Sequence, residues 1–163
     1  MCIRDRPDHI LIETSGLDLP KPLLKAFDWP DIRSRITVDG VIALADAEAV
    51  AAGQFAPDLA GVEIQRAADN QLNHDTPLAE VFDDQVACAD LILLTKSDLA
   101  GQSEKDKARE RIADVAPRPL PVIEVTDGRV DPRLILGLEA AAEDDLAARP
   151  SHHDGAVSYT HLT

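Results

Sequence analysis

The chain has 163 residues, which suits one domain, and 45% of them are hydrophobic, which is enough to build a core, although aromatic residues make up only 3%. The formal net charge of −14 argues against partners such as nucleic acid or an anionic membrane surface. No apolar stretch is long enough to cross a bilayer, and the 2 cysteines show no pairing pattern, so we expect a cytoplasmic protein from a reducing compartment.

The first predicted element is a strand over His9–Thr14. Its centre is the continuous apolar run Ile10 to Ile12, which is followed by Glu13 and then by Gly16. Ligands of open α/β sheets bind at the carboxyl ends of the strands. A carboxylate there can hold magnesium or orient an attacking water, which makes Glu13 the candidate catalytic and metal-binding residue. Gly16, which has no Cβ, lets the backbone approach a terminal phosphate. The alternative is an ordinary strand end with a glycine turn before a helix.

Strands and helices then alternate along the chain. The predicted helices are Lys21–Phe27, Ala47–Ala52, Pro57–Asn70, Leu78–Ala89, a charged helix up to Val115 with a capping box of Ser103 and Asp106, and Pro132–Ala148. The predicted strands after the first are Thr37–Leu44, Asp90–Leu94 and Pro121–Val125. This alternation indicates βαβ units, and therefore an α/β fold in which helices flank a parallel β-sheet.

The second informative motif is Thr95-Lys96-Ser97-Asp98, which follows the apolar run of the predicted strand Asp90–Leu94. Guanine presents two adjacent N–H donors, and one carboxylate can accept both, so Asp98 would select guanine. Lys96 can lay its aliphatic stem over the base and keep its ammonium in water. The alternative is a solvated turn in which Asp98 caps a helix. Thr126, after the last predicted strand, is a further candidate for contact with the base.

Four other features are open at this stage. Cys88 on a predicted helix suits a small buried residue better than a metal ligand. His74-Asp75 suits a turn, with a partner contact as the alternative, and His152-His153-Asp154 suits a solvated linker, with transient metal binding as the alternative. Gln85 is expected to form hydrogen bonds within the loop network. For Asp90, at the start of the next predicted strand, the sequence suggests no specific chemical role.

Together these motifs resemble the CobW family of P-loop GTPases. The similar stretches are Ile12 to Leu17 with Leu19-Pro20, Val38 to Ala47, Asn73 to Leu78, Phe82 to Asp90, and Thr95 to Asp98, in the family's order. The resemblance implies a partial P-loop NTPase fold of the GTPase type and a nucleotide site that includes Gly16, Thr95, Lys96, Asp98 and Thr126. Thr95 stands where Asn is commoner in the family.

The resemblance also implies a function. We expect a GTP-hydrolysing metallochaperone that uses GTP and Mg²⁺ and delivers Co²⁺ for cobalamin biosynthesis, with a cobaltochelatase as its client. The alternatives are a zinc- or nickel-directed GTPase of the same superfamily and a non-catalytic α/β binding module. The metal of such a chaperone would be held by a Cys-x-Cys-Cys motif, which this sequence does not contain.

The ends of the chain fit neither the family nor the local pattern. Residues 1–6 and 157–163 look like translated sequencing adapters, and we exclude them from fold reasoning. Residues 7–149 are then expected to be a partial GTPase domain and residues 150–156 a linker to a further domain. No G-x-x-x-x-G-K-[ST] segment occurs, so we expect an internal fragment that does not hydrolyse GTP by itself.

Overall fold

The structure is a computed structural model that describes residues 7–55, 61 and 78–151. Its helices are α1 (Pro20–Phe27), α2 (Pro30–Arg33), α3 (Ala47–Ala51), α5 (Leu78–Cys88) and α6 (Gln102–Val115), with 3₁₀ turns at η1 (Pro132–Leu134) and η2 (Leu146–Ala148). Its strands are β1 (Ile42–Asp46), β2 (Leu91–Thr95) and β3 (Val122–Glu124). The strands lie in the order β1-β2-β3 and are all parallel. The predicted α/β fold with a parallel sheet and flanking helices is therefore confirmed.

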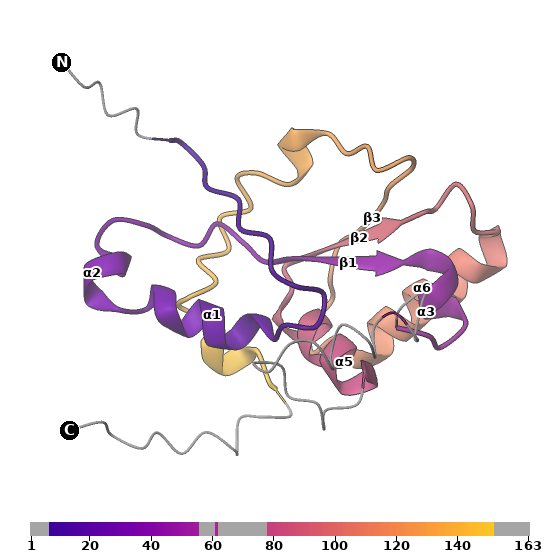
Figure 1. Ribbon diagram of the computed structural model, residues 1–163, viewed down its shortest axis with the longest axis horizontal. Helices are drawn as coiled ribbons and strands as arrows, with labels where there is room; N and C mark the ends of the chain where they lie inside the picture. Colours follow the sequence, from indigo (N-terminus) through magenta and orange to yellow (C-terminus); the bar gives the residue numbers. More distant parts are fainter. Residues whose placement is uncertain (1–6, 56–60, 62–77, 152–163) are drawn as a thin grey trace.

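One face of the sheet packs on the helices. Because side chains alternate between the faces of a strand, Ala45, Ile92 and Leu94 point to the same side. There they pack with buried residues of α3, α5 and α6, among them Val86, Ala108 and Ile112. Figure 1 shows these three helices together on one side of the strands. The core is aliphatic, as the low aromatic content predicts, with Phe55 and Phe82 in contact at its margin (ring centroids 4.9 Å apart).

The opposite face is covered by an irregular strap rather than by a helix. We call residues 129–142 the strap. Its side chains Val130, Ile135 and Leu138 pack against Leu91, Leu93 and Val125 of the central part of the sheet. The strap passes close to the chain at Gly40, where an added Cβ would lie 2.6 Å from Leu138 Cδ1. In Figure 1 it forms the orange loop on the side of the sheet away from α5.

The strap replaces the helix predicted over Pro132–Ala148, and that prediction is wrong. Gly137, Glu139 and Ala141 adopt positive φ angles of 74°, 53° and 44°, which a right-handed helix cannot contain. The carboxylate of Asp39 explains this conformation, because it accepts hydrogen bonds from the backbone N–H groups of Gly137 (2.7 Å) and Glu139 (2.9 Å). The backbone therefore bonds to Asp39 instead of to its own helical partners.

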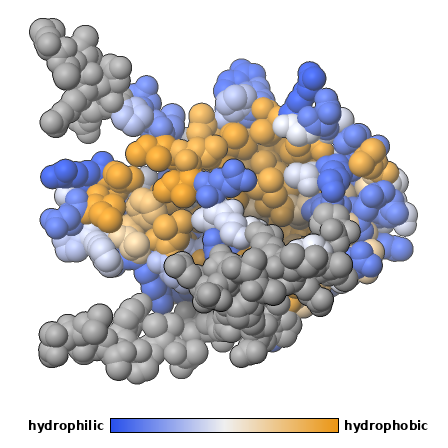
Figure 2. Space-filling view, in the orientation of Figure 1, coloured by the Kyte–Doolittle hydropathy of each residue, from blue (hydrophilic) through white to orange (hydrophobic). Residues whose placement is uncertain are grey.

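The strand predicted over His9–Thr14 is also absent. A strand needs a neighbour whose backbone groups pair with its own, and none of the described backbone hydrogen bonds involves residues 9–14. The apolar run is exposed instead, with Ile10 at 62%, Leu11 at 82% and Ile12 at 52%. Leu44 of the edge strand β1 is 69% exposed as well. Figure 2 shows a broad apolar area on this side of the molecule, as expected for a sheet that is covered incompletely.

The other predicted elements that lie within the described residues are confirmed with shifted ends. Strand β1 runs over Ile42–Asp46 rather than Thr37–Leu44, and β2 ends at Thr95.

The predicted capping box of Ser103 and Asp106 is wrong: α6 begins at Gln102, and the Glu104 carboxylate accepts the N–H of Gly101 (2.7 Å). Short α2 was not predicted. The predicted helix Pro57–Asn70, its following loop and the His74-Asp75 and His152 to Asp154 motifs lie outside the described residues, except that Gly61 is helical.

The anchoring of the strap gives the first prediction. The backbone N–H of Glu139, and those of Leu138 and Gly137, hold the pKa of Asp39 below its usual value although burial opposes them. A carboxyl group with a lowered folded-state pKa stabilises the fold above its unfolded pKa of about 3.9, and this contribution is lost as the pH falls through the folded-state pKa. Asp39→Asn should therefore lower the free energy of unfolding by about 1 kcal/mol at pH 7.

Urea unfolding at pH 7 and at pH 3 measures this effect. The difference between the wild-type protein and Asp39→Asn should shrink as the pH falls. Asp114→Asn removes an exposed carboxylate from α6 and is the matched control, with little expected effect. An Asp39→Asn variant as stable as the wild type at pH 7 would show that the carboxylate does not anchor the strap.

Candidate functional site

Because the three strands are parallel, their carboxyl ends meet at one edge of the sheet. Asp46 at the end of β1 is the register partner of Thr95 at the end of β2, and Leu94 pairs with Glu124 at the end of β3. The polar segments that follow β2 and β3 therefore begin side by side. We call this the carboxyl edge.

The loop Thr95-Lys96-Ser97-Asp98 is fixed to this edge by three hydrogen bonds. The Thr95 hydroxyl donates to the Ala45 carbonyl of β1 (3.2 Å). The Ser97 hydroxyl donates to the Leu94 carbonyl (2.7 Å), and the Ser97 N–H donates to the Val125 carbonyl (3.2 Å). Ser97 is buried, whereas Lys96 and Asp98 are exposed. The buried residue holds the loop and leaves its two neighbours exposed at the carboxyl edge.

Lys96 has an unusual backbone and a close partner. Its φ of 55° lies in the left-handed region, which non-glycine residues rarely adopt. Its ammonium lies 2.5 Å from Asp46 Oδ2, and the hydrogen bond to Asp46 raises the pKa of Lys96. Burial opposes ionisation of Asp46, but the hydrogen bonds from Lys96 and from the Ala49 N–H outweigh it and lower the pKa of Asp46. The two groups form an ion pair across the ends of β1 and β2.

Asp98 faces the turn that follows β3. Asp127 (φ 52°) and Gly128 (φ 66°) take the two left-handed positions of a tight turn, which the Arg129 N–H closes by donating to the Thr126 carbonyl (2.9 Å). This is the geometry that Asp-Gly sequences favour. The Asp127 N–H reaches Asp98 Oδ1 at 3.4 Å, a long contact. Within the described part of the chain, Asp98 Oδ2 accepts no hydrogen bond, so it is available to a ligand.

The structure thus brings Thr95, Lys96, Asp98 and Thr126 together at one edge. It also excludes the alternative interpretation of Asp98 as a helix cap, because the residue that precedes α6 is Gly101. Asp46 was not singled out as a site residue. Its position at the end of a strand, directly before a helix, is a signal that could have identified it.

Glu13 and Gly16 lie in a separate loop. Gln85 of α5 donates its side-chain amide to the carbonyls of Gly16 (3.0 Å) and Asp18 (3.1 Å), so this loop is fixed to the helix layer. Figure 1 shows the segment descending beside α1 and α5. None of the described contacts joins Glu13 or Gly16 to Lys96 or Asp98. The predicted hydrogen bonding of Gln85 within the loop network is confirmed.

The structure leaves the predicted magnesium site at Glu13 untested. Glu13 is exposed, and no group of three or more His, Cys, Asp or Glu side chains that could hold a metal ion occurs in the described ranges. Magnesium at Glu13 therefore stays a prediction. Cys88 is fully buried, in agreement with the interpretation that it packs in the core.

Asp90, for which the sequence suggested no role, is the centre of an ion-pair cluster with buried Arg149 and partly exposed Arg118. Its Oδ1 lies 2.7 Å from both Arg118 Nη2 and Arg149 Nη2. Its Oδ2 accepts the Val41 N–H (2.9 Å) and a second bond from Arg149 (3.1 Å). Arg149 is 1% exposed, and it also donates to the Cys88 carbonyl. The cluster fixes the segment around Arg149 against the start of β2, at the opposite end of the strand from the carboxyl edge.

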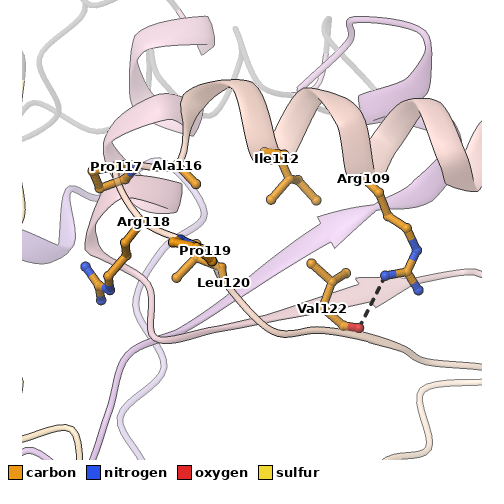
Figure 3. Close-up of a pocket in the computed structure, with 9 residues that line it drawn as sticks. Arg109, Ile112, Ala116, Pro117, Arg118, Pro119, Leu120 and Val122 are labelled. Atoms are coloured by element: carbon orange, nitrogen blue, oxygen red, sulfur yellow. Dashed lines mark hydrogen bonds between the residues drawn. The ribbon is translucent and has the colours of Figure 1, made fainter.

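A groove of about 550 Å³ lies between the carboxyl-terminal half of α6 and the start of β3. Figure 3 shows its lining, where Ile112 and Val122 face each other and Arg109 donates to the Val122 carbonyl (3.4 Å). Because it lies at the amino-terminal end of β3, this groove is separate from the carboxyl edge.

Among the residues that the structure describes, no helix has the length and apolar character needed to cross a bilayer.

Comparison with known proteins settles the family. The CobW/HypB/UreG nucleotide-binding domain matches residues 1–123. The chain belongs to this family. The predicted resemblance to CobW is therefore confirmed, and the carboxyl edge described above lies within or directly beside the matched region.

Two relatives are named zinc chaperone CobW. The one from Sinorhizobium sp is 48% identical over 92% of this chain, and the one from Pseudomonas aeruginosa is 47% identical over 90%. The zinc chaperone YjiA of Escherichia coli is 33% identical over 90% of the chain. The crystal structure of Zn(II)-bound YjiA GTPase from E. coli is 30% identical, with a TM-score of 0.49 over 74% of this chain and 30% of that chain. The chain spans only 42%, 39% and 39% of the length of the three relatives.

Proposed function

We propose that the chain forms part of the guanine-nucleotide-binding domain of a GTP-hydrolysing metallochaperone. The observation that carries the proposal is the carboxyl edge, where Lys96 and Asp98 project from a loop that buried Ser97 fixes. Membership of a nucleotide-binding family supports it. The names of the relatives support the metallochaperone role.

The chemistry of the edge suits guanine. The available Oδ2 of Asp98, with Oδ1, can accept the two adjacent N–H groups of the base as a charge-assisted pair. Adenine offers no such pair of donors. The stem of Lys96 can lie against one face of the base while its ammonium stays with Asp46. Thr126 and Asp127 bring a second loop to the same place.

The proposal for the metal follows the names of the relatives. The sequence resemblance led to Co²⁺ and a cobaltochelatase client, whereas the relatives that match most of this chain are named zinc chaperones. We therefore propose zinc as the cargo and keep cobalt, to which the resemblance led, as the second candidate, because imidazole and carboxylate groups can bind either ion. The client is open in both cases.

The experiment uses the whole protein, at the length of its relatives. Fluorescent GTP, ATP and XTP are titrated into it, and phosphate release is measured with zinc or cobalt added. We expect tight binding of GTP, weak binding of ATP, and GTP turnover that zinc changes more than cobalt does. Equal affinity for GTP and ATP would contradict guanine selection. Binding without any turnover would favour the alternative of a non-catalytic α/β module.

Glu13→Gln in the whole protein should bind GTP nearly normally and hydrolyse it at least about tenfold more slowly. The proposed role of the carboxylate lies at Mg²⁺ and the attacking water, where stabilisation is gained mainly in the transition state. Affinity and single-turnover hydrolysis are measured on the same samples. Asp18→Asn, in the same loop, is the control for local disturbance, because the Asp18 carboxylate accepts the Ser15 N–H there (3.0 Å). Equal losses of binding and turnover in Glu13→Gln would indicate a structural role.

A further inference from the structure

Asp46 uses its two carboxylate oxygens for two different partners. Oδ1 accepts the Ala49 N–H at 3.0 Å and so caps α3. Oδ2 lies 2.5 Å from the ammonium of Lys96. The capping bond restricts the rotation of the carboxylate, since the first turn of a helix holds its N–H groups in fixed directions. The second oxygen therefore has a defined position at the carboxyl edge.

Lys96 needs such a partner more than an ordinary surface lysine does. The lysine side chain has a flexible four-carbon stem, and an exposed lysine samples many positions. Here the backbone adopts a left-handed conformation (φ 55°), and 47% of the side chain is exposed. The side chain of Asp46 is only 16% exposed, so the anchoring oxygen is well shielded from water. Because the Asp46 carboxylate is held by its capping bond and the Lys96 side chain is not, the position of Asp46 determines where the Lys96 stem lies.

We propose that Asp46 is a positioning residue of the nucleotide site, which holds the Lys96 ammonium so that the lysine stem forms one wall of the base pocket beside Asp98. The inference rests on the proposed function, because it assigns Asp46 to the same guanine site. Asp46 does not touch the nucleotide in this account. It acts through Lys96, and its capping of α3 is a second, separable role. The raised pKa of Lys96 agrees with the pairing.

Two substitutions separate the roles. Asp46→Ser keeps a good helix cap but cannot reach the ammonium, whereas Asp46→Glu keeps a carboxylate that can reach it but caps poorly. Glu48→Gln is the matched control. The negative charge of Glu48, in the first turn of α3, raises the pKa of Lys96, but Glu48 makes no hydrogen bond to the lysine. Stability is followed by urea unfolding and base binding by fluorescent GDP, both in the whole protein.

If the proposal is right, Asp46→Ser should unfold near the wild-type midpoint and bind GDP roughly three- to fivefold more weakly, the upper range for a partly exposed ion pair. Asp46→Glu should restore the affinity while it lowers the midpoint. Glu48→Gln should leave the affinity unchanged. In Asp46→Ser, an NMR titration of Lys96 should show its pKa falling toward the usual value even without nucleotide.

Two results would overturn the proposal, and they are distinguishable from failure of the proposed function. Wild-type affinity in Asp46→Ser, in a protein that binds GDP, would remove the positioning role and leave the guanine site in place. Weaker binding in Asp46→Glu together with wild-type affinity in Asp46→Ser would show that the cap, not the ion pair, matters. If the wild-type protein binds no guanine nucleotide, the proposed function fails and the positioning role fails with it.

Discussion

Replacing Asp90 by Asn should lower the free energy of unfolding by about 3–5 kcal/mol, because it leaves buried arginine without its counter-charge. Asp90 balances two guanidinium groups, and one of them, on Arg149, is only 1% exposed. Arg118 Nη1 and Arg149 Nε already have no hydrogen-bond partner within the described residues. An asparagine would keep a bond to Val41 but lose both charge-assisted pairs.

Urea unfolding of the variants measures this effect. Asp83→Asn is the matched control, because its pair with Arg111 (3.3 Å) is partly exposed and worth at most about 1 kcal/mol. Asp90→Asn combined with Arg149→Met should be more stable than Asp90→Asn alone, since the unpaired charge is then removed as well. An Asp90→Asn variant no less stable than the control would show that the cluster does not fix the segment around Arg149.

The fold could be predicted from the sequence where the local pattern and the tertiary environment agree. The run Leu91 to Leu94 is apolar on both faces, and β2 is the central strand with both faces covered. The same reasoning fails for His9–Thr14, although that segment also contains a continuous apolar run. A strand depends on a neighbouring strand as well as on its own residues, and the described structure gives this segment no neighbour.

The strap could not be predicted for a related reason. Residues 132–148 are rich in Ala, Leu and Glu, which favour a helix. The competing interaction comes from Asp39, roughly a hundred positions earlier in the chain, and no local pattern reveals it. The cap of α6 was missed for a local reason. The true pair is Gly101 with Glu104, and glycine is a weaker capping signal in a sequence than the nearby Ser103.

The candidate site was predictable at the carboxyl edge, because Thr95 to Asp98 follow a strand directly and the chemistry of each residue type is distinctive. Asp46 was missed, although it also follows a strand, because its partner Lys96 is close only in the folded chain. The predicted roles of Glu13 and Gly16 remain predictions. The structure shows only that Gln85 fixes their loop to α5.

Asp98→Asn in the whole protein should weaken GTP binding by about 2–5 kcal/mol, because loss of one partner of a desolvated charge pair has an effect of this size. An amide oxygen can still accept the N1–H of guanine, but the amide nitrogen opposes the N2–H₂ group donor to donor. Xanthine carries a carbonyl at that position, which the asparagine amide can bond. The variant should therefore prefer XTP, and its stability should be unchanged because Asp98 is exposed and its one described contact is long (3.4 Å).

The measurement that tests guanine recognition most directly is the ratio of GTP to XTP affinity in the wild-type protein and in Asp98→Asn, by competition against one fluorescent nucleotide. Asp127→Asn is the control, because it changes a carboxylate on the facing turn whose backbone N–H, not its side chain, contacts Asp98. We expect the ratio to invert in Asp98→Asn and to stay the same in Asp127→Asn. An unchanged preference for GTP in Asp98→Asn would contradict the assignment of the carboxyl edge as the guanine site.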